Sequence, residues 1–295
     1  TAISGNVTTI TYNIIDSASS VDLDGATINT FSNNTISNSC SLQWGNITVV
    51  DSVLNNQFTN GLTWLASNMV TNTILAGVWS GGTWDTHDSS IYAIYGNYTQ
   101  SSVNAVGANV TVEFNNSITD SSLTLNNFNG ERIADNIIQY STIDLTDAVI
   151  TEVSVNLFQF ATVDLSQAEM QNMNNNNVIN SFVSGIATII LSNFSYNVLL
   201  SNSYFNMAGA NVYDGNIDGN YLSSDSSITI TDAYITEVLF NNLTNSSAIE
   251  GTSIVDGFLA GNSLNQAGIS VENCEFASIQ QNFLDRGSIS VQPFS

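Results

Sequence analysis

A repeat of about 20 residues runs through most of this chain and limits what it can fold into. Three consecutive segments align without a gap, beginning at Ser121, Ser141 and Ala161: SSLTLNNFNGERIADNIIQY, STIDLTDAVITEVSVNLFQF and ATVDLSQAEMQNMNNNNVIN. The same template fits segments that begin at Ser19, Ala187, Ser226 and Ala267. The third and fifth positions are apolar and their neighbours are mostly polar, which predicts a strand with one buried face.

Each repeat holds two further short apolar stretches, separated by Asn, Asp, Ser and Gly. Three short strands and three turns make one coil of a parallel β-helix, in which each coil bonds to the next at about 4.8 Å. The single proline of the chain agrees with this, because proline removes a hydrogen bond between strands. We therefore expect an all-β, single-stranded parallel β-helix (a β-solenoid) of about 12 coils, forming one domain over residues 1–295.

Asparagine recurs at the sixteenth position of the repeat, where the chain is expected to turn. Its side chain tolerates left-handed turn geometry, and its amide can bond to the asparagines of the coils above and below. We expect a ladder formed by Asn34, Asn56, Asn136, Asn156, Asn176, Asn202, Asn241, Asn262 and Asn282.

The segment SSITITDAYITEVLFNNLTN, residues 226–245, resembles a coil of the right-handed parallel β-helix, or pectate-lyase-like, repeat superfamily. The resemblance covers most of residues 19–60 and 121–292 and implies the fold, whereas activity varies within the superfamily among lyases, hydrolases, phage tailspikes and surface proteins. Its lyases combine carboxylate-bound calcium with an Arg or Lys base. This chain has no lysine, and Arg132 shares position 12 with Glu152 of the next coil, a salt-bridge partner. A lyase is therefore disfavoured.

The charge of the chain excludes several classes of partner. Two arginines, Arg132 and Arg286, stand against 25 acidic residues, for a formal net charge of −23. Such a chain cannot neutralise phosphates, so we expect no nucleic-acid binding and no attachment to anionic membranes. The sequence contains no run of about 18 apolar residues, so we expect no transmembrane helix. The polar residues of the chain are mostly amides and hydroxyls, and its two arginines leave trypsin-like proteases little to cut. The sequence starts at Thr1, as a processed chain would. We therefore expect an extracellular or cell-surface protein.

Residues 61–120 fit the repeat badly, and we expect an irregular, tryptophan-rich segment there. It holds three of the four tryptophans, Trp64, Trp79 and Trp84, and the only histidine, His87. Aromatic side chains bind sugars, so a glycan cleft is one interpretation. The alternative is a subunit contact or a core filled by large side chains. His87 lies between Asp85 and Asp88, which is too local an arrangement for a catalytic triad and too few ligands for a closed metal site.

One pair of carboxylates is the candidate for chemistry on the surface of the helix. Asp144 and Asp164 share outward position 4 of adjacent coils and would stack about 5 Å apart. That separation suits a retaining glycosidase or a calcium site. Nothing else converges on the pair, because the expected neighbours in the column are Thr124 and Ile190, so two solvated aspartates are the main alternative. We expect no other cofactor.

The two cysteines are about ten coils apart, or on the order of 50 Å, so they cannot pair within one chain. Cys274 occupies an inward position, whereas Cys40 lies near a turn and is the candidate for a disulfide between subunits. Sequons are about as frequent as chance predicts, so they permit glycosylation without indicating it. They begin at Asn6, Asn33, Asn46, Asn97, Asn109, Asn115, Asn193, Asn242 and Asn245.

These observations favour a secreted structural protein, not an enzyme, that assembles with itself into a filament, sheath or surface layer. Both ends of the chain lack a capping helix, and an uncapped solenoid end invites head-to-tail stacking. In style the chain is similar to the acidic, durable sheath and surface-layer proteins secreted by archaea. The alternative is a β-helix that binds or depolymerises glycans, such as a phage tailspike or a secreted hydrolase. An ice-binding solenoid is a weaker third hypothesis, because the outward positions mix Thr with Ser, Asp and Ile.

Overall fold

The computed structural model describes residues 5–16, 19–45, 48–59, 63–67, 70–81, 83–87, 90–104, 109–186, 189–208, 211–212, 215–231, 235–252, 257–273 and 276–292. Within these ranges the secondary structure is entirely β, and neighbouring strands pair in parallel. The predicted parallel β-solenoid, built from turns of about 20 residues, is therefore confirmed. In the part of the chain that is described, there is no helix that could span a membrane.

The chain divides into two compact units, Thr1–Ala148 and Val149–Ser295. The first unit contains β1 (Asn6–Thr11), β2 (Ile14–Ile15), β3 (Ser20–Asp22), β4 (Thr27–Ser32), β5 (Thr35–Ile36), β6 (Ser41–Gly45), β7 (Thr48–Thr59), β8 (Thr63–Ser67), β9 (Val70–Ser80), β10 (Thr83–His87), β11 (Ser90–Thr99), β12 (Ser102–Asn104), β13 (Asn109–Thr119), β14 (Ser122–Thr124), β15 (Asn129–Ala134), β16 (Ile137–Gln139) and β17 (Thr142–Asp144).

The second unit repeats the same plan. It contains β18 (Val149–Ser154), β19 (Leu157–Gln159), β20 (Thr162–Asp164), β21 (Glu169–Asn174), β22 (Asn177–Ile179), β23 (Phe182–Ile186), β24 (Ile189–Ser195), β25 (Val198–Leu200), β26 (Tyr204–Ala208), β27 (Asn211–Val212), β28 (Gly215–Asp218), β29 (Tyr221–Leu222), β30 (Ser227–Thr231), β31 (Ile235–Leu239), β32 (Asn242–Thr244), β33 (Ala248–Thr252), β34 (Gly257–Ala260), β35 (Ser263–Asn265), β36 (Gly268–Glu272), β37 (Phe276–Gln280), β38 (Phe283–Asp285) and β39 (Ser288–Val291).

Apolar side chains stack inside each unit because the strands of successive turns lie in register. One inward column of the second unit pairs in the order Val163, Val183, Phe205, Ile228, Ile249, Ile269 and Ile289. All of these side chains but the last are buried. Phe194 and Phe205 meet edge to face in the core, with ring centroids 4.8 Å apart. The period-2 pattern of the sequence thus becomes a continuous apolar interior.

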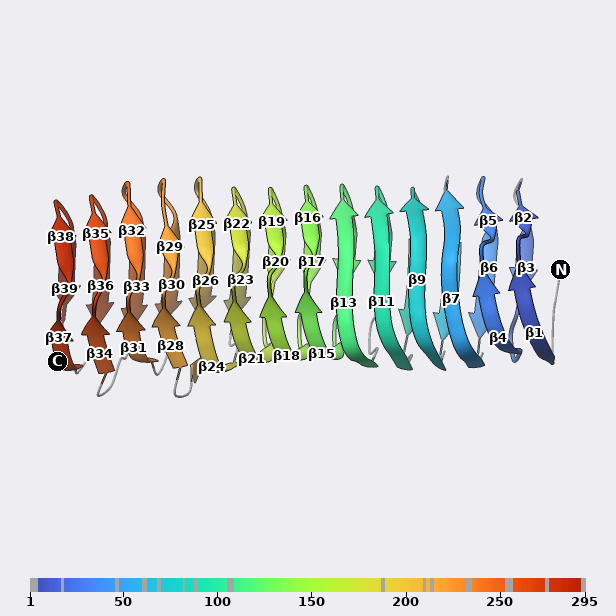
Figure 1. Cartoon of the computed structure of the whole chain (residues 1–295), viewed down its shortest axis with the longest axis horizontal. Coiled ribbons are helices and arrows are strands. Elements are labelled where there is room, and N and C mark those ends of the chain that lie inside the picture. The colour runs from blue at the N-terminus through green and yellow to red at the C-terminus, as the bar shows by residue number, and fades with distance from the viewer. Residues whose placement is uncertain are drawn as a thin grey trace. The chain divides into compact units, whose positions relative to one another are not determined.

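The strands of residues 61–120 continue the parallel pairing of the first unit. In this region β9, β11 and β13 are long and unbroken, as is β7 before them, where other turns have two short strands (Figure 1). Turns of that shape explain why the template fits the segment badly. The number of turns also differs slightly from the 12 expected. Turns vary in length: ladder asparagines one turn apart are 20 residues apart in one place and 23 in another.

The predicted asparagine ladder is present in both units. In the first unit, Asn13 donates to Asn34, which donates to Asn56. In the second unit the ladder runs through Asn156, Asn176, Asn197, Asn220, Asn241, Asn262 and Asn282. At each step both the backbone N–H and the side-chain Nδ2 donate to Oδ1 of the asparagine one turn later, as at Asn34 and Asn56 with distances of 2.9 and 3.0 Å.

Two details of the predicted ladder are wrong. The repeat predicted to begin at Ala187 does not coincide with a turn of the structure. The turn begins at Ser181, and its third residue, Val183, pairs with Val163 of the turn before. Its ladder residue is therefore Asn197, whereas Asn202 is an exposed turn residue with φ of 57°. The turn of residues 203–225 contributes Asn220, which the template missed. The pairing of β21 with β24 is irregular between Met170 and Asn172, and such a shift defeats gapless alignment.

The residue with left-handed backbone geometry (positive φ) lies one position before the ladder asparagine and not at the asparagine itself, where it was expected. Asp135, Val155, Asn175 and Phe240 all have φ between 51° and 57°, and each directly precedes a ladder position. The ladder asparagines are absent from the positive-φ residues. Asparagine is favoured at the sixteenth position for its hydrogen bonds across turns, because the left-handed turn is made by its predecessor.

Candidate interaction surface at the end coils

The last described turn, formed by β37, β38 and β39, leaves its interior side chains uncovered. Ile279 is 49% exposed and Leu284 is 43% exposed. Their partners one turn earlier, Leu259 and Leu264, are each 0% exposed. All four side chains are large and aliphatic, and the difference is that the earlier pair is covered by a following turn. This end of the second unit therefore presents an open apolar core.

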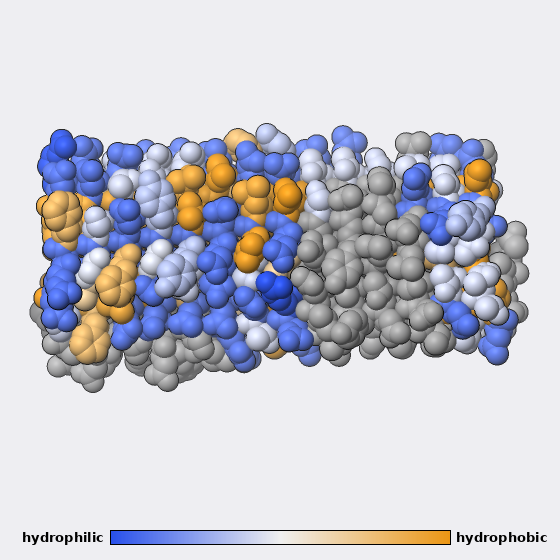
Figure 2. Space-filling view, viewed as in Figure 1, coloured by the Kyte–Doolittle hydropathy of each residue, from blue (hydrophilic) through white to orange (hydrophobic). Residues whose placement is uncertain are grey.

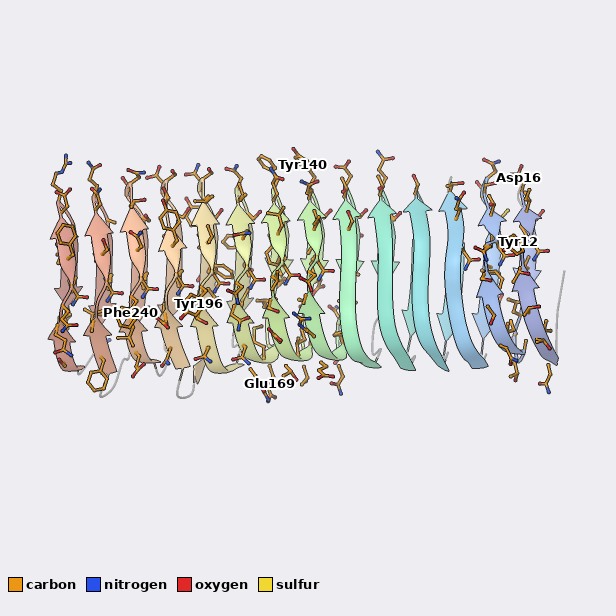
Figure 3. All side chains as sticks on the ribbon, in the orientation of Figure 1. Tyr12, Asp16, Tyr140, Glu169, Tyr196 and Phe240 are labelled. Atoms are coloured by element: carbon orange, nitrogen blue, oxygen red, sulfur yellow. The ribbon has the colours of Figure 1, made fainter. Side chains whose placement is uncertain are left out.

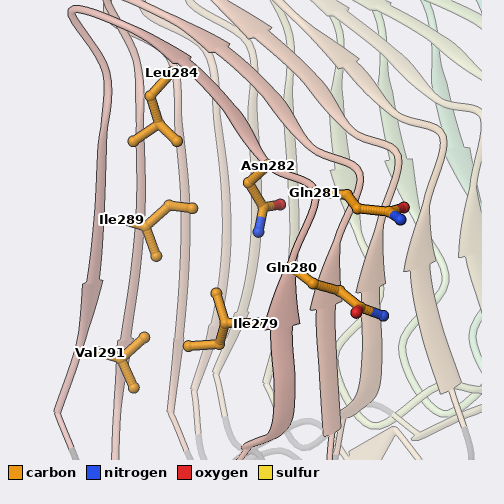
Figure 4. A pocket seen from close by; sticks show the side chains of 7 residues that line it. All are labelled: Ile279, Gln280, Gln281, Asn282, Leu284, Ile289 and Val291. Carbon is orange, nitrogen blue, oxygen red and sulfur yellow. The ribbon is translucent and has the colours of Figure 1, made fainter.

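A hollow of about 540 Å³ opens at this end (Figure 4). It is lined by Ile279, Gln280, Gln281, Asn282, Leu284, Ile289 and Val291. The apolar members extend from strands on facing sides of the turn into the space between them (Figure 4). Apolar surface also appears at this end in the space-filling view (left edge in Figure 2).

The first turn, formed by β1, β2 and β3, has the same character. Its inward residues Val7, Ile10, Ile15 and Val21 are half-buried. Their partners in the next turn, Ile28, Phe31, Ile36 and Leu42, are buried. Among the described strands, those of the first and last turns each pair on one side only, so each end also presents a free strand edge.

The asparagine ladder ends differently at the two end turns. At the first turn, Asn13 donates from its backbone N and from Nδ2 to Asn34 Oδ1, both at 2.9 Å. Among the described residues nothing is assigned to donate to Asn13 Oδ1. At the last turn, Asn282 Oδ1 accepts from Asn262, and its Nδ2 donates to the Leu259 carbonyl at 3.0 Å. Within the same ranges its backbone N–H has no assigned acceptor.

The charged residues of the end turns lie beside the ladder. At the C-terminal end, Arg286 Nε lies 3.6 Å from Asp285 Oδ1, and both side chains are largely exposed. At the N-terminal end, Asp16 Oδ1 accepts hydrogen bonds from Ser37 Oγ at 3.1 Å and from Asn38 Nδ2. These bonds hold the Asp16 carboxylate against the second turn (Figure 3).

The residues of the expected glycan cleft lie on different strands of the first unit. Trp64 and Trp84 are in register with each other and with Leu42, which is buried. Trp79 is in register with Phe58, in the column of buried Ile36. The predicted glycan cleft and its alternatives, a subunit contact or a core filled by large side chains, therefore stay predictions.

His87 ends β10 in register with Ser67. Its neighbour Asp88 lies outside the described residues. In the part of the chain that is described, no three His, Cys, Asp or Glu side chains gather as a metal site.

Asp144 and Asp164 fall in different units, and each is engaged in its own turn. Asp144 Oδ1 accepts from the backbone N and the hydroxyl of Thr146, at 3.0 and 2.7 Å. Asp164 Oδ1 accepts from Ser166 in the same way, at 2.9 and 2.6 Å. Such bonds fix a tight turn. The expected column neighbour Thr124 is correct for Asp144, but Asp164 pairs with Ser184 and not with Ile190.

Asn126 supplies a further partner for Asp144. With its amide nitrogen turned to the carboxylate, Asn126 Nδ2 lies 2.8 Å from Asp144 Oδ1 and 3.1 Å from Oδ2. Arg132, expected to pair with Glu152, lies 3.8 Å from Asp135 of its own turn. The carboxylates that sequence singled out therefore have structural partners close by.

Cys40 is buried, and its thiol donates to the Ser37 carbonyl at 2.8 Å. A disulfide between subunits would need this side chain to leave the core. Cys274 lies outside the described residues, as does the sequon residue Asn46. Of the other sequon residues, Asn6, Asn33, Asn242 and Asn245 are exposed and Asn193 is half-buried; Asn97, Asn109 and Asn115 lie on strands β11 and β13.

A second ladder, made by serine, was not predicted. In the first unit the backbone N–H of Ser101 donates to Ser121 Oγ, and that of Ser121 donates to Ser141 Oγ, both at 3.1 Å. In the second unit Ser203 N donates to Ser226 Oγ at 3.2 Å. The signal was visible as serine at the first position of most repeats.

Comparison of the chain with family models, with curated proteins and with solved structures finds no match.

Proposed function

We propose that this chain is an extracellular structural protein that assembles with copies of itself, through its end turns, into a filament, sheath or surface layer. The observation that carries the proposal is the exposed interior of the last turn, where Ile279 and Leu284 lack the cover that Leu259 and Leu264 have. The resemblance to pectate-lyase-like β-helices, and in style to archaeal sheath and surface-layer proteins, supports a durable scaffold. No catalytic residue is part of the proposal.

Burial of the open ends supplies the driving force for assembly. Each large aliphatic side chain taken from water to a packed interior contributes about 1.5–3 kcal/mol when the burial is complete. Ile279 and Leu284 are already half covered, so each contributes about half of that. Ile10 and Ile15 at the other end are also half-buried. The free strand edges add hydrogen bonds along the same contact.

Charge opposes assembly and makes it depend on solution conditions. Each copy carries a formal net charge of −23, so copies repel one another. Calcium binds carboxylate oxygens, and low pH protonates them. Divalent cations, added salt or acid are therefore expected to increase the mass of polymer.

The experiment is negative-stain electron microscopy with sedimentation of the purified chain, in calcium and in chelator. Ordered filaments, tubes or sheets are expected in calcium. Leu284→Glu places a charge in the open core and should abolish them. Ile137→Glu is the matched control, because Ile137 is 47% exposed on an outward position of the first unit. Monodisperse particles in every buffer, or equal loss in both variants, would contradict the proposal.

A further inference from the structure

We infer that copies of this chain stack head to tail in a single register, with Asn282 of one copy lying over Asn13 of the next and the asparagine ladder continuing across the junction. This inference rests on the proposed function, since it specifies the contact through which the copies assemble. The partner is a second copy of the chain, and the surface is the pair of end turns.

The ladder has a direction, and its two ends are complementary. At Asn34 and Asn220 the backbone N–H and Nδ2 both donate to Oδ1 of the asparagine in the later turn, and Nδ2 also donates to a backbone carbonyl of the earlier turn. Oδ1 of each accepts from the asparagine of the earlier turn. The first turn therefore ends in an acceptor, Asn13 Oδ1, and the last turn in a donor, the Asn282 backbone N–H. Two first turns or two last turns placed together would face acceptor against acceptor or donor against donor. The ladder thus favours a head-to-tail contact over a symmetric one.

The same register aligns the apolar columns. Ile279 precedes Asn282 by three residues, as Ile10 precedes Asn13. Leu284 follows Asn282 by two residues, as Ile15 follows Asn13. Stacking the asparagines therefore places each exposed side chain of the last turn over a half-buried one of the first turn. A shift of one residue would put an outward side chain over every inward one.

The register also gives one of the two arginines a role. Asp285 and Asp16 each lie three residues after a ladder asparagine, so their carboxylates would stack about one strand spacing, or ~4.8 Å, apart. Like charges at that distance repel. Arg286 already lies 3.6 Å from Asp285, on the same edge, and would neutralise the pair. The junction therefore carries its own cation in an otherwise acidic chain.

Engineered cysteines test the register. Ile14 and Phe283 each follow a ladder asparagine by one residue, and they are 81% and 66% exposed. In the proposed register their Cα atoms lie about 5 Å apart, within disulfide range. The double variant Ile14→Cys/Phe283→Cys should form covalent polymers under mild oxidation, seen as a ladder on non-reducing gels. Ile14→Cys/Ser290→Cys is the control, because Ser290 lies on β39, in the other sheet. The wild-type chain controls for Cys40 and Cys274.

The outcomes separate the register from the proposed function. Disulfide polymers in the first variant alone support the inference. Polymers by microscopy with no disulfide, or with a disulfide only in the Ser290 variant, overturn the register and leave self-assembly standing. Absence of any polymer overturns both. Arg286→Gln should lower the polymer mass several-fold at low salt, whereas Arg132→Gln, which makes the same charge change away from the ends, should not; equal effects would contradict the role of Arg286.

Discussion

Asn241 makes two hydrogen bonds to one oxygen of Asn262. The backbone N–H and the side-chain Nδ2 of Asn241 each lie 3.0 Å from Asn262 Oδ1. Asn241 Nδ2 also donates to the Ile217 carbonyl at 2.9 Å, one turn back. Asn241 Oδ1 in turn accepts both donors of Asn220. The side-chain amide of Asn241 thus satisfies two backbone groups of the preceding turn, the Asn220 N–H and the Ile217 carbonyl, and bonds to the asparagine of the next turn, where the chain bends and strand pairing cannot do so.

Replacement of this amide is expected to be costly. Asn241→Ala leaves the backbone N–H and Nδ2 of Asn220 without their buried acceptor, and an unsatisfied buried group costs about 1–3 kcal/mol. We expect a loss of about 3 kcal/mol in the free energy of unfolding, measured by urea denaturation. Asn242→Ala, the exposed neighbour, should cost less than about 0.5 kcal/mol. Similar losses in the two variants would show that the ladder adds nothing beyond an ordinary asparagine.

The sequence predicted the fold well because the spacing of its apolar residues follows directly from the geometry of strands and turns. A strand alternates every two residues, and a turn repeats whenever the chain returns to the same column, so Leu123 over Ile143 could be foreseen. The errors occurred where a turn gains residues. Ser181 begins a turn that reaches its asparagine at Asn197, and the next turn, from Ser203, reaches Asn220. No gapless template can follow such insertions.

The open ends could be foreseen only in part. The repeat marks Ile279 and Leu284 as inward positions, but their exposure in the last described turn is seen only in the structure. The direction of the ladder was not visible either, because an asparagine side chain has both a donor and an acceptor. Only the geometry shows that Oδ1 accepts from the earlier turn, as at Asn34, Asn56 and Asn197.

Substitution of Gly261 is expected to destabilise the second unit. Gly261 has φ of 67°, and a Cβ there would lie 2.5 Å from Cδ1 of Phe240. Phe240, labelled in Figure 3, is 64% exposed on the second unit. Gly261→Ala therefore adds a ring displacement to the cost of left-handed geometry, and we expect a loss of about 2–3 kcal/mol in unfolding free energy.

Gly25→Ala separates these two costs. Gly25 has φ of 69°, but no atom lies within 4 Å of its Cβ position, so this variant should lose only the left-handed cost, about 1–2 kcal/mol. In the double variant Phe240→Ala/Gly261→Ala the ring is gone, and the combined loss should be smaller than the sum of the single losses. Strict additivity in this cycle would show that the ring and the glycine do not interact.

The aromatic pair in the core should dominate local stability of the second unit. Phe194 and Phe205 are both fully buried and meet at an interplanar angle of 85°. Phe194→Ala opens a large cavity and should cost about 3–5 kcal/mol. Phe182→Ala removes an aromatic side chain that is 40% exposed and should cost about 1 kcal/mol or less.

Hydrogen exchange measures where the core loss is felt. A solenoid is stabilised by contacts between neighbouring turns, so amides near β24 and β26 should lose protection first in Phe194→Ala. Uniform loss of protection over the whole chain would contradict this local coupling.

Asp218 is expected to make the stability of the second unit depend on pH. Burial raises the pKa of its carboxyl above the ordinary value of 3.8, and a hydrogen bond from the Gly219 backbone N–H partly opposes that shift. Its Oδ1 is buried with no assigned partner in the described residues. The folded state therefore binds the proton more tightly than the unfolded state does. The stability that protonation contributes is fully present below pH 3.8 and is lost as the pH rises through the raised pKa.

Asp218→Asn removes this loss, since the amide stays neutral. The variant should melt at a higher temperature than the wild-type chain at neutral pH, and the difference should shrink as the pH falls toward about 4. Asp225→Asn controls for the loss of one negative charge, because Asp225 is an exposed turn residue of the same unit and its φ of 59° suits asparagine. A gain in melting temperature that is the same at both pH values, or that is equal in the two variants, would mean that overall charge and not the burial of Asp218 sets the effect.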